Sequence, residues 1–251
     1  ISLENALRHL NIAPDVNGIG NQWLHRKTEG ADWYFVCADR ETPFNGEVEF
    51  NCTGRVEIWN PVNGTVKEIP STQQDGKTRL DIVLSRAECA FVVFHHDGKP
   101  SQAKPQQEVT STLLSEQTWT VSFPDGWGID APLTITSLKS WHEMISSAEG
   151  KAFSGTATYR TTLHMDKVEK DANYTLQLGN VEMIAVVRLN GEELGTLWTE
   201  PYQADISTAL KKGDNTLEID VTSSWFNRLV YDAGLPEAER KTWVISGPRK
   251  E

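Results

Sequence analysis

The stretch Ala185–Trp198, which reads AVVRLNGEELGTLW, predicts a β-hairpin. Its apolar residues Ala185, Val187 and Leu189 fall at every second position, so their side chains point to one face of a strand. Asn190-Gly191 follows, a pair that supplies the positive φ angles of a tight two-residue turn. A hairpin with one apolar and one polar face needs a second sheet to cover it, which is the arrangement of a β-sandwich.

The same period of two continues on both sides of this hairpin. Residues 217–222 alternate between apolar and polar, and residues 156–163 are rich in β-forming types. Residues 23–96 carry six or seven further strand-like segments separated by turns, including a tight turn predicted at Asn63-Gly64. Because no long amphipathic helices alternate with these strands, a parallel α/β barrel is excluded. We therefore predict an all-β fold of two antiparallel sandwiches.

The first residues predict a short amphipathic helix, because Leu3, Leu7 and Leu10 share one helical face. A helix this short is marginal alone, so we expect it to dock on another part of the protein. Residues 1–20 are predicted to be a helix and linker leading in from an upstream region. The opening Ile1-Ser2-Leu3, without Met or an apolar leader, predicts a processed form or an excised fragment.

Composition predicts where the two domains meet. Residues 97–117 are polar and contain two Pro and several Gln, Ser and Thr, which is typical of an interdomain linker. The predicted domains are an antiparallel β-sandwich at residues 21–96 and a second β-sandwich at residues 118–251.

Charge and hydropathy exclude several classes of partner. The 251 residues include 24 Lys and Arg against 35 Asp and Glu, which gives a net charge of −11. Nucleic acids and anionic membrane surfaces are recognised by basic groups, so neither is an expected partner. No apolar run approaches the roughly 20 residues of a membrane span. Nine Trp and 38% hydrophobic residues are ample for packed cores.

The cysteines are Cys37, Cys52 and Cys89, an odd number that cannot complete a disulfide framework. Each lies among strand-like residues, so we predict three buried, inert thiols. No spacing of Cys and His indicates zinc. No metal site and no cofactor are expected.

Several motifs of the second β region occur in a characteristic order. They are FSGTATYR at 153–160, LQLG at 176–179, AVVRLNGEELG at 185–195, WTEPYQADI at 198–206 and KGDNTLEI at 212–219. This order resembles the galactose-binding-like jelly roll that is the sugar-binding domain of family 2 glycoside hydrolases and their relatives. The resemblance implies a jelly-roll β-sandwich and a carbohydrate partner.

Other stretches resemble the C-terminal β-domains of glycoside hydrolase family 106, the α-L-rhamnosidases. They are HRKTEGADWYFV at 25–36, EIWNPVNG at 57–64, SWFNRL at 224–229 and EAERKTW at 237–243. The resemblance implies a C-terminal place in a longer enzyme, an upstream catalytic barrel in the same polypeptide, and a secreted or periplasmic location. The family's catalytic carboxylates and calcium site are assigned to that barrel. No position of this chain matches them, so no catalytic residue is carried over and calcium is not indicated.

The predicted function is therefore that of a non-catalytic accessory portion of a glycoside hydrolase acting on rhamnose-containing glycans. Glycoside hydrolysis needs two carboxyl groups roughly 5–10 Å apart across the bond, and no spacing in this chain singles out such a pair. Two alternatives stay open. One is a self-standing carbohydrate-binding protein, and the other is a fragment of a family 2 β-glycosidase.

Six residues are candidates for carbohydrate binding, and all but Glu200 are predicted to gather at one end of the second sandwich, since they lie at predicted strand ends. They are Trp198, Glu200, Tyr202, Trp225, Asn227 and Arg228. The aromatic rings can stack on the C–H face of a pyranose, and the planar polar groups can bind its hydroxyls. The alternative is that the aromatic residues plug the end of the sandwich. For Arg228 we expect stacking on Trp225 or pairing with Asp205.

Overall fold

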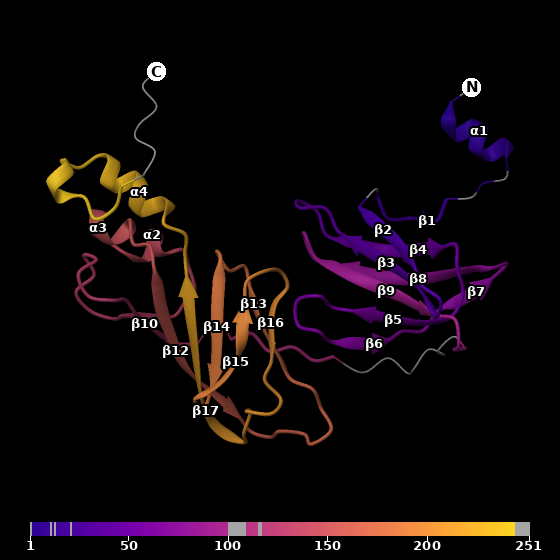
Figure 1. Cartoon of the computed structure of the whole chain (residues 1–251). Helices are drawn as coiled ribbons and strands as arrows, with labels where there is room; N and C mark the ends of the chain where they lie inside the picture. Colours follow the sequence, from indigo (N-terminus) through magenta and orange to yellow (C-terminus); the bar gives the residue numbers. More distant parts are fainter. Residues whose placement is uncertain are drawn as a thin grey trace. The chain divides into compact units, whose positions relative to one another are not determined.

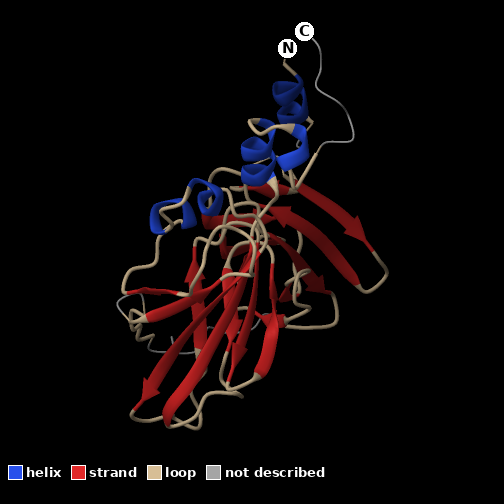
Figure 2. Cartoon of the chain, turned by 90° about the vertical axis from the view of Figure 1, so that its left-hand side faces the viewer, coloured by secondary structure: helices blue, strands red, loops and turns tan. Residues whose placement is uncertain are grey.

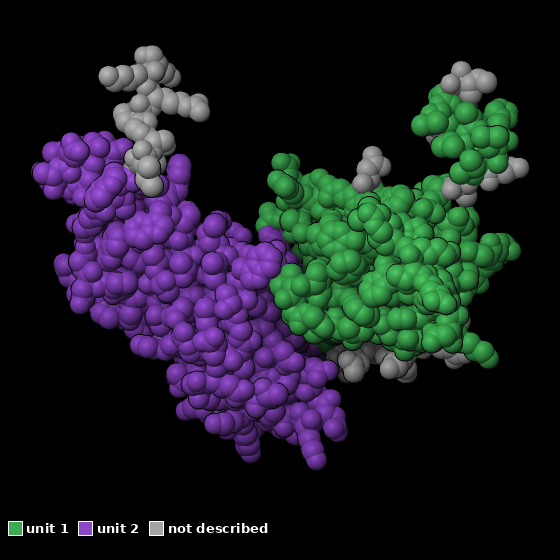
Figure 3. All heavy atoms as spheres, viewed as in Figure 1, with its two compact units in different colours: residues 1–109 green, residues 110–251 purple. Residues whose placement is uncertain are grey.

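The structure is a computed structural model that describes residues 2–10, 12, 14–20, 22–99, 109–114 and 117–243. The chain divides into two compact units, residues 1–109 (unit 1) and residues 110–251 (unit 2), which Figure 3 shows in green and purple. The division falls within the predicted linker 97–117, of which residues 100–108 and 115–116 lie outside the described residues. The predicted domain limits, and the linker itself, stay predictions.

Unit 1 contains two antiparallel sheets, with strand orders β1-β4-β8-β7 and β2-β3-β9-β5-β6 (Figure 1). Its elements are α1 (Leu3–His9), β1 (Val16–Asn17), β2 (Trp23–Lys27), β3 (Ala31–Cys37), β4 (Phe44–Phe50), β5 (Arg55–Trp59), β6 (Val66–Glu68), β7 (Thr72–Gln74), β8 (Lys77–Leu84) and β9 (Cys89–His95). Residues 1–20 are thus more than a helix and linker, because β1 pairs with β4. The leucines of the helix, Leu3, Leu7 and Leu10, are all exposed.

The core of unit 1 lies between these two sheets. Along β8, Leu80, Ile82 and Leu84 are buried while the residues between them are exposed, as the period-two pattern predicts. Tyr34 and Phe94 from one sheet meet Phe50 from the other, with ring centroids 4.9 and 5.2 Å from that of Phe50. Burying aromatic rings from both sheets joins them into one sandwich.

The cysteine prediction is wrong. Cys37 on β3 and Cys89 on β9 lie directly opposite each other, with their Cα atoms 4.1 Å apart, and form a disulfide. Only Cys52 is a free thiol, and burial raises its pKa to about 12. Three cysteines can therefore form one disulfide, here between two strands that are distant in the sequence, and leave one free thiol.

Unit 2 contains a six-stranded antiparallel sheet of order β11-β10-β12-β17-β14-β15 and a two-stranded sheet, β13-β16, with short helices at one end (Figures 1 and 2). Its elements are β10 (Trp119–Ser122), β11 (Leu133–Ile135), α2 (Trp141–Met144), α3 (Ala148–Lys151), β12 (Thr156–Met165), β13 (Thr175–Gly179), β14 (Ile184–Leu189), β15 (Glu192–Leu197), β16 (Tyr202–Asp205), β17 (Gly213–Thr222), α4 (Phe226–Ala233) and a short 3₁₀ turn at Glu237–Glu239.

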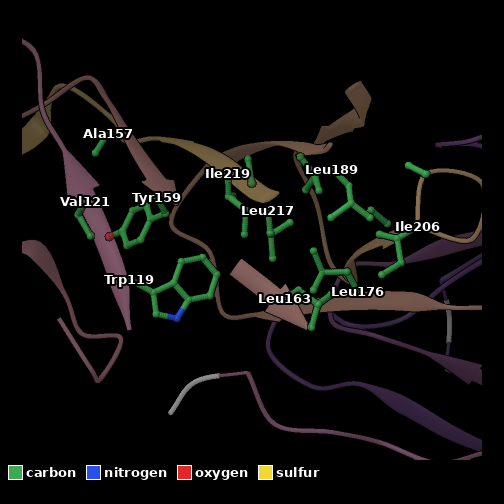
Figure 4. Packing of buried hydrophobic residues seen from close by; sticks show 14 of the residues in the cluster. Trp119, Val121, Ala157, Tyr159, Leu163, Leu176, Leu189, Ile206, Leu217 and Ile219 are labelled. Atoms are coloured by element: carbon green, nitrogen blue, oxygen red, sulfur yellow. The ribbon is translucent and has the colours of Figure 1, made fainter. Parts of the chain in front are cut away.

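The core of unit 2 lies between its two sheets. Figure 4 shows Leu163, Leu189 and Leu217 of the large sheet near Leu176 of the small sheet and Ile206, the residue just after β16. All five are buried. The ladder between β12 and β17 runs without a break from Thr156 opposite Thr222 to Met165 opposite Gly213. Antiparallel sheets enclosing a core in each unit confirm the predicted all-β sandwich class.

The hairpin predicted at Asn190-Gly191 is confirmed, because both residues have positive φ (55° and 84°) and Leu189 pairs with Glu192. The Asn190 side chain also donates to Asn215 Oδ1 at 2.8 Å and accepts from the Thr216 backbone N–H at 3.1 Å. Fully buried Asn215 donates in turn to the carbonyl of Lys211. The two asparagines therefore fasten the hairpin to the start of β17.

The turn at Asn63-Gly64 differs from the tight form expected. Trp59 pairs with Val66, so residues 60–65 form a wider loop between β5 and β6. The side chain of Asn60 accepts from the backbone N–H of Val62 at 2.8 Å, and Gly64 alone of the Asn-Gly pair has positive φ. A side-chain cap at Asn60 has replaced the two-residue turn.

Candidate functional site

Strand register brings the two predicted tryptophan positions to the same end of unit 2. On β14, Ile184 lies opposite Thr222 of β17, and Ala185 lies opposite Leu197 of β15. Trp198 directly follows Leu197, and Trp225 follows Thr222 by three residues. Because β14 lies between β15 and β17, the two strand ends are about 10 Å apart, which is two strand spacings.

The connection from Trp198 to Tyr202 forms one side of this end. Trp198 is 58% exposed, and the following Glu200–Pro201 peptide bond is cis. The Tyr202 hydroxyl donates to the carbonyl of Met183, the residue just before β14, at 3.1 Å. Burial raises the pKa of the Tyr202 phenol, and the nearby Glu200 carboxylate raises it further. Tyr202 is therefore tied to the same end of the sheet as Trp198.

Trp225 stands at the start of α4 and is both packed and accessible. Its ring centroid lies 5.8 Å from that of Trp127, yet the residue is 50% exposed. The next residues, Phe226 and Asn227, are also exposed. One part of the indole is therefore held by the protein while the rest faces outward, which combines the two alternatives left open by the sequence.

Arg228 lies beneath this surface, with 1% of its side chain exposed. Its Nε forms an ion pair with Asp232 Oδ1 at 2.8 Å, although the Nε–H is not aligned for a hydrogen bond. A second ion pair joins Arg228 Nη1 to Glu149 Oε1 at 3.5 Å. The guanidinium also stacks between Trp127 and Tyr231, about 5 Å from each ring centroid. The expected partners Trp225 and Asp205 are thus wrong. Arg228 fixes the position of α4.

Asp232 connects α4 to the segment that follows it. Burial alone would raise the pKa of Asp232, but hydrogen bonds from Thr242 and the charge of Arg228 hold it below its usual value. The backbone and hydroxyl of Thr242 donate to Asp232 Oδ2 at 2.6 and 2.8 Å. A carboxylate held by these groups is ionised at neutral pH and keeps the segment around Thr242 against α4.

Together these contacts place Trp198, Tyr202 and Trp225 at one end of a rigid sandwich, with Asn227 exposed beside Trp225. Exposed indole rings held by a rigid scaffold can stack on sugar rings, and loops at sandwich ends are common binding positions. The binding roles assigned to the six residues stay predictions.

Sequence reasoning missed a second aromatic cluster, in unit 1. Trp33 on β3 and Trp59 on β5 meet at 5.0 Å in an edge-to-face contact. Beside them, Glu57 accepts from Trp59 Nε1 at 2.8 Å and from His95 Nε2 at 2.9 Å. Glu-x-Trp at 57–59 and Trp-x-Phe at 33–35 share the period-two spacing that places aromatic and acidic side chains on one strand face.

Within the described part of the chain, no group of three or more His, Cys, Asp or Glu residues is arranged to hold a metal ion. Over the same residues, no helix has the length and apolar character needed to cross a membrane.

Comparison with known proteins identifies the relatives of this chain. Residues 149–243 match the family described as glycosyl hydrolase 2 galactose-binding domain-like. A Formosa agariphila protein named "Putative beta-glucuronidase" is 38% identical over 182 residues, which are 68% of this chain and 16% of that protein. The structure of a rhamnosidase from Novosphingobium sp. PP1Y is similar over 96% of this chain and 24% of its own, with 30% identity and a TM-score of 0.82.

This chain thus spans about a sixth of one relative and a quarter of the other. The matched residues 149–243 contain α4, all of α3 but its first residue, and the strands from β12 to β17. Both tryptophans of the candidate site lie within this range. Residues 149–243 match a galactose-binding-like domain of the glycosyl hydrolase 2 type, and the fold of the chain is similar to the β-domains of a rhamnosidase.

Proposed function

We propose that this chain is the non-catalytic accessory portion of a longer glycoside hydrolase that acts on rhamnose-containing glycans. The observation that supports it is the rhamnosidase likeness, which extends over 96% of this chain at a TM-score of 0.82. In this proposal the catalytic domain lies elsewhere in the same polypeptide. The end of unit 2 around Trp198 and Trp225 contacts the carbohydrate.

The shifted carboxyl groups of the described residues belong to structural pairs. Each Asp or Glu with a resolved shift has a lowered pKa, and Glu57, held by Arg55, Trp59 and His95 against the effect of burial, falls to about 2. Such groups are permanent anions suited to structural pairing.

The proposal also includes a secreted or periplasmic location. The Cys37–Cys89 disulfide supports it, because disulfides persist mainly in oxidising compartments. No cofactor is proposed for this part of the protein.

The test compares this chain with the longest polypeptide that its gene encodes. We expect the long form to hydrolyse an aryl α-L-rhamnoside and this chain alone to give only the uncatalysed rate. Hydrolysis of an aryl β-D-glucuronide instead would favour a family 2 β-glycosidase, and turnover by the isolated chain would contradict the non-catalytic role.

The carbohydrate contact is tested with single tryptophan variants. We expect Trp198→Ala to weaken binding of a rhamnose-containing oligosaccharide at least fivefold in calorimetric titration, because an exposed stacking ring is lost. Trp243→Ala is the matched control, since Trp243 is also exposed but lies outside the six candidates. Equal affinity of both variants and the wild type would remove Trp198 from the site.

A further inference from the structure

Unit 1 has an open pocket of about 560 Å³ at one end of its five-stranded sheet. One side is the turn between β2 and β3, residues 28–31, and the other is the end of β9, residues 95–97, with Trp33 between them. Pockets of 300–1,000 Å³ are the usual size for small-molecule ligands. All of its lining residues belong to unit 1, and none is among the six candidate residues of unit 2.

The walls of the pocket are held in place by their own hydrogen bonds. The backbone N–H of Thr28 donates to the carbonyl of Ala31 at 2.9 Å, which closes the turn. The backbone N–H of His96 donates to the carbonyl of Gly30 at 3.0 Å, which joins the two sides. A site with fixed walls loses little conformational entropy when a ligand binds.

Both histidines of the pocket are fixed at one ring nitrogen. His95 Nε2 lies 2.9 Å from Glu57 Oε2, and His96 Nε2 lies 2.7 Å from Asp32 Oδ2. The Asp32 side chain is 4% exposed, and although burial alone would raise its pKa, hydrogen bonds from His96 and His25 lower it. An ionised carboxylate accepts, so each histidine donates from Nε2 and leaves Nδ1 as an acceptor when neutral.

Trp33 supplies the aromatic part of the pocket. Its indole N–H is enclosed and has no hydrogen-bond partner among the described residues, whereas the N–H of neighbouring Trp59 donates to Glu57 at 2.8 Å. An unpaired buried donor is destabilising.

The Asp and Glu side chains that line the pocket are Glu29 and Asp97. Arg55 interacts with Asp97 and Lys27 lies 3.8 Å from Asp32, but neither basic side chain lines the pocket. An anionic ligand would therefore meet two carboxylates. A neutral polyhydroxylated ligand suits this lining, because its C–H face can stack on Trp33 and its hydroxyls can donate to carboxylate and imidazole acceptors.

We propose that this pocket is a second carbohydrate site, on unit 1, that binds one neutral sugar residue. The ring stacks on Trp33, and its hydroxyls donate to Glu29, Asp97 and the free imidazole nitrogens. The proposal is independent of the proposed function, because it needs neither a catalytic domain nor the tryptophans of unit 2.

The test titrates the ¹⁵N-labelled chain with L-rhamnose, D-galactose and D-glucose and follows the backbone amide signals. We expect at least one sugar to shift the signals of Gly30, Ala31 and His96 with millimolar affinity. Glu29→Gln should weaken binding at least threefold and Trp33→Ala at least tenfold. Glu41→Gln, an exposed position outside the pocket, is the matched control and should bind like the wild type.

Glu29→Gln keeps the test decisive if Trp33→Ala perturbs the fold, because Glu29 is exposed. The proposal is overturned if none of the three sugars shifts the pocket signals, or if Glu29→Gln binds as tightly as Glu41→Gln. Tighter binding of tetramethylammonium than of any sugar would assign the pocket to cations instead. Trp198→Ala should leave these shifts unchanged, and the rhamnoside assay decides the proposed function separately.

Discussion

The outer faces of the two large sheets differ in chemistry. On the six-stranded sheet of unit 2, Thr158 donates to Asp220 at 2.7 Å, and Arg188 donates to the same carboxylate at 2.8 Å. Arg188 also donates to Glu218 at 2.9 Å. These side chains stand on three adjacent strands, so the outer face of unit 2 is a polar ladder whose members satisfy one another.

The five-stranded sheet of unit 1 carries apolar side chains on both faces. Val93 points to the face away from the Tyr34 core, where its neighbours across the sheet are Trp33 on one side and Glu57 on the other. It is nevertheless fully buried. The rings of Trp33 and Trp59 meet 5.0 Å apart, from the strands on either side of Val93. A strand with apolar side chains on both faces has a continuous hydrophobic sequence, as residues 89–94 do.

The difference teaches where function can be sought in this molecule. A polar ladder is complete in water and needs no ligand. An outer aromatic cluster is an exception to the alternation of apolar and polar faces that is common in antiparallel sheets. In unit 1 that exception, Trp33, lines the pocket with His95.

The largest effect is expected from emptying either core. Phe94→Ala in unit 1 and Phe153→Ala in unit 2 each remove a fully buried ring, which costs about 3–5 kcal/mol. Because the units have separate cores, each variant should lower one calorimetric transition and leave the other in place. A parallel shift of both transitions in either variant would contradict their independence.

Removing the disulfide should affect unit 1 alone. Cys37 and Cys89 are 52 residues apart, and losing a bridge of this kind lowers the free energy of unfolding by about 2–4 kcal/mol. The loss in free energy of unfolding is measured by comparing the thermal unfolding of the double variant Cys37→Ser/Cys89→Ser with that of the wild type. Dithiothreitol should destabilise the wild type and have no effect on the double variant, which serves as the control.

Asp232→Asn tests the charged anchor of α4 in unit 2. The Asp232 carboxylate accepts a hydrogen bond from Thr242 and pairs with Arg228. Removing its charge should lower the free energy of unfolding by about 2 kcal/mol at pH 7. A lowered folded-state pKa gives stability that is present above the ordinary aspartate value of 3.8 and is lost as pH falls through the folded pKa.

Denaturant unfolding of the wild type and Asp232→Asn across pH 2–7 should therefore give two curves that converge below about pH 4. Asp205→Asn is a control with a lowered pKa in the same unit, and its carboxylate has Ser207 rather than Arg228 as partner. A constant difference down to pH 2 would show that Asp232 acts by packing rather than by charge.

The smallest effect is expected on the polar ladder. Arg188→Met removes the cation shared by Glu218 and Asp220 but keeps much of the side-chain volume. Partly exposed ion pairs contribute about 0–1 kcal/mol, so unit 2 should lose no more than that, and less at high salt. A loss above 2 kcal/mol would mean that the ladder, rather than the core, sets the stability of this sheet.

Much of the fold could be predicted from the sequence because local patterns decide it. The hairpin at Asn190-Gly191 follows from residues that tolerate positive φ, and β8 and β17 follow from alternation. The Cys37–Cys89 bridge could not be predicted, since pairing of β3 with β9 joins residues that are distant in the sequence. Register between distant strands depends on the whole sandwich.

The candidate site was predictable in part for the same reason. Trp198 and Trp225 were placed by strand ends, which alternation reveals. The partners of Arg228 were missed because α4 buries its charged residues and exposes Phe226 and Val230, the reverse of an ordinary surface helix. The Arg-x-x-x-Asp spacing of Arg228 and Asp232 was the signal available, since residues four apart face each other on a helix.

The Cys37–Cys89 bond also closes residues 37–89 into a covalent ring. The ring contains every strand from β4 to β8 and the loops between them, including the wide loop at residues 60–65. A protease that cuts one of these loops therefore releases no fragment, because both new ends stay attached through the sulfur bridge. Such a nicked molecule keeps its full mass on a non-reducing gel and separates into pieces only after reduction.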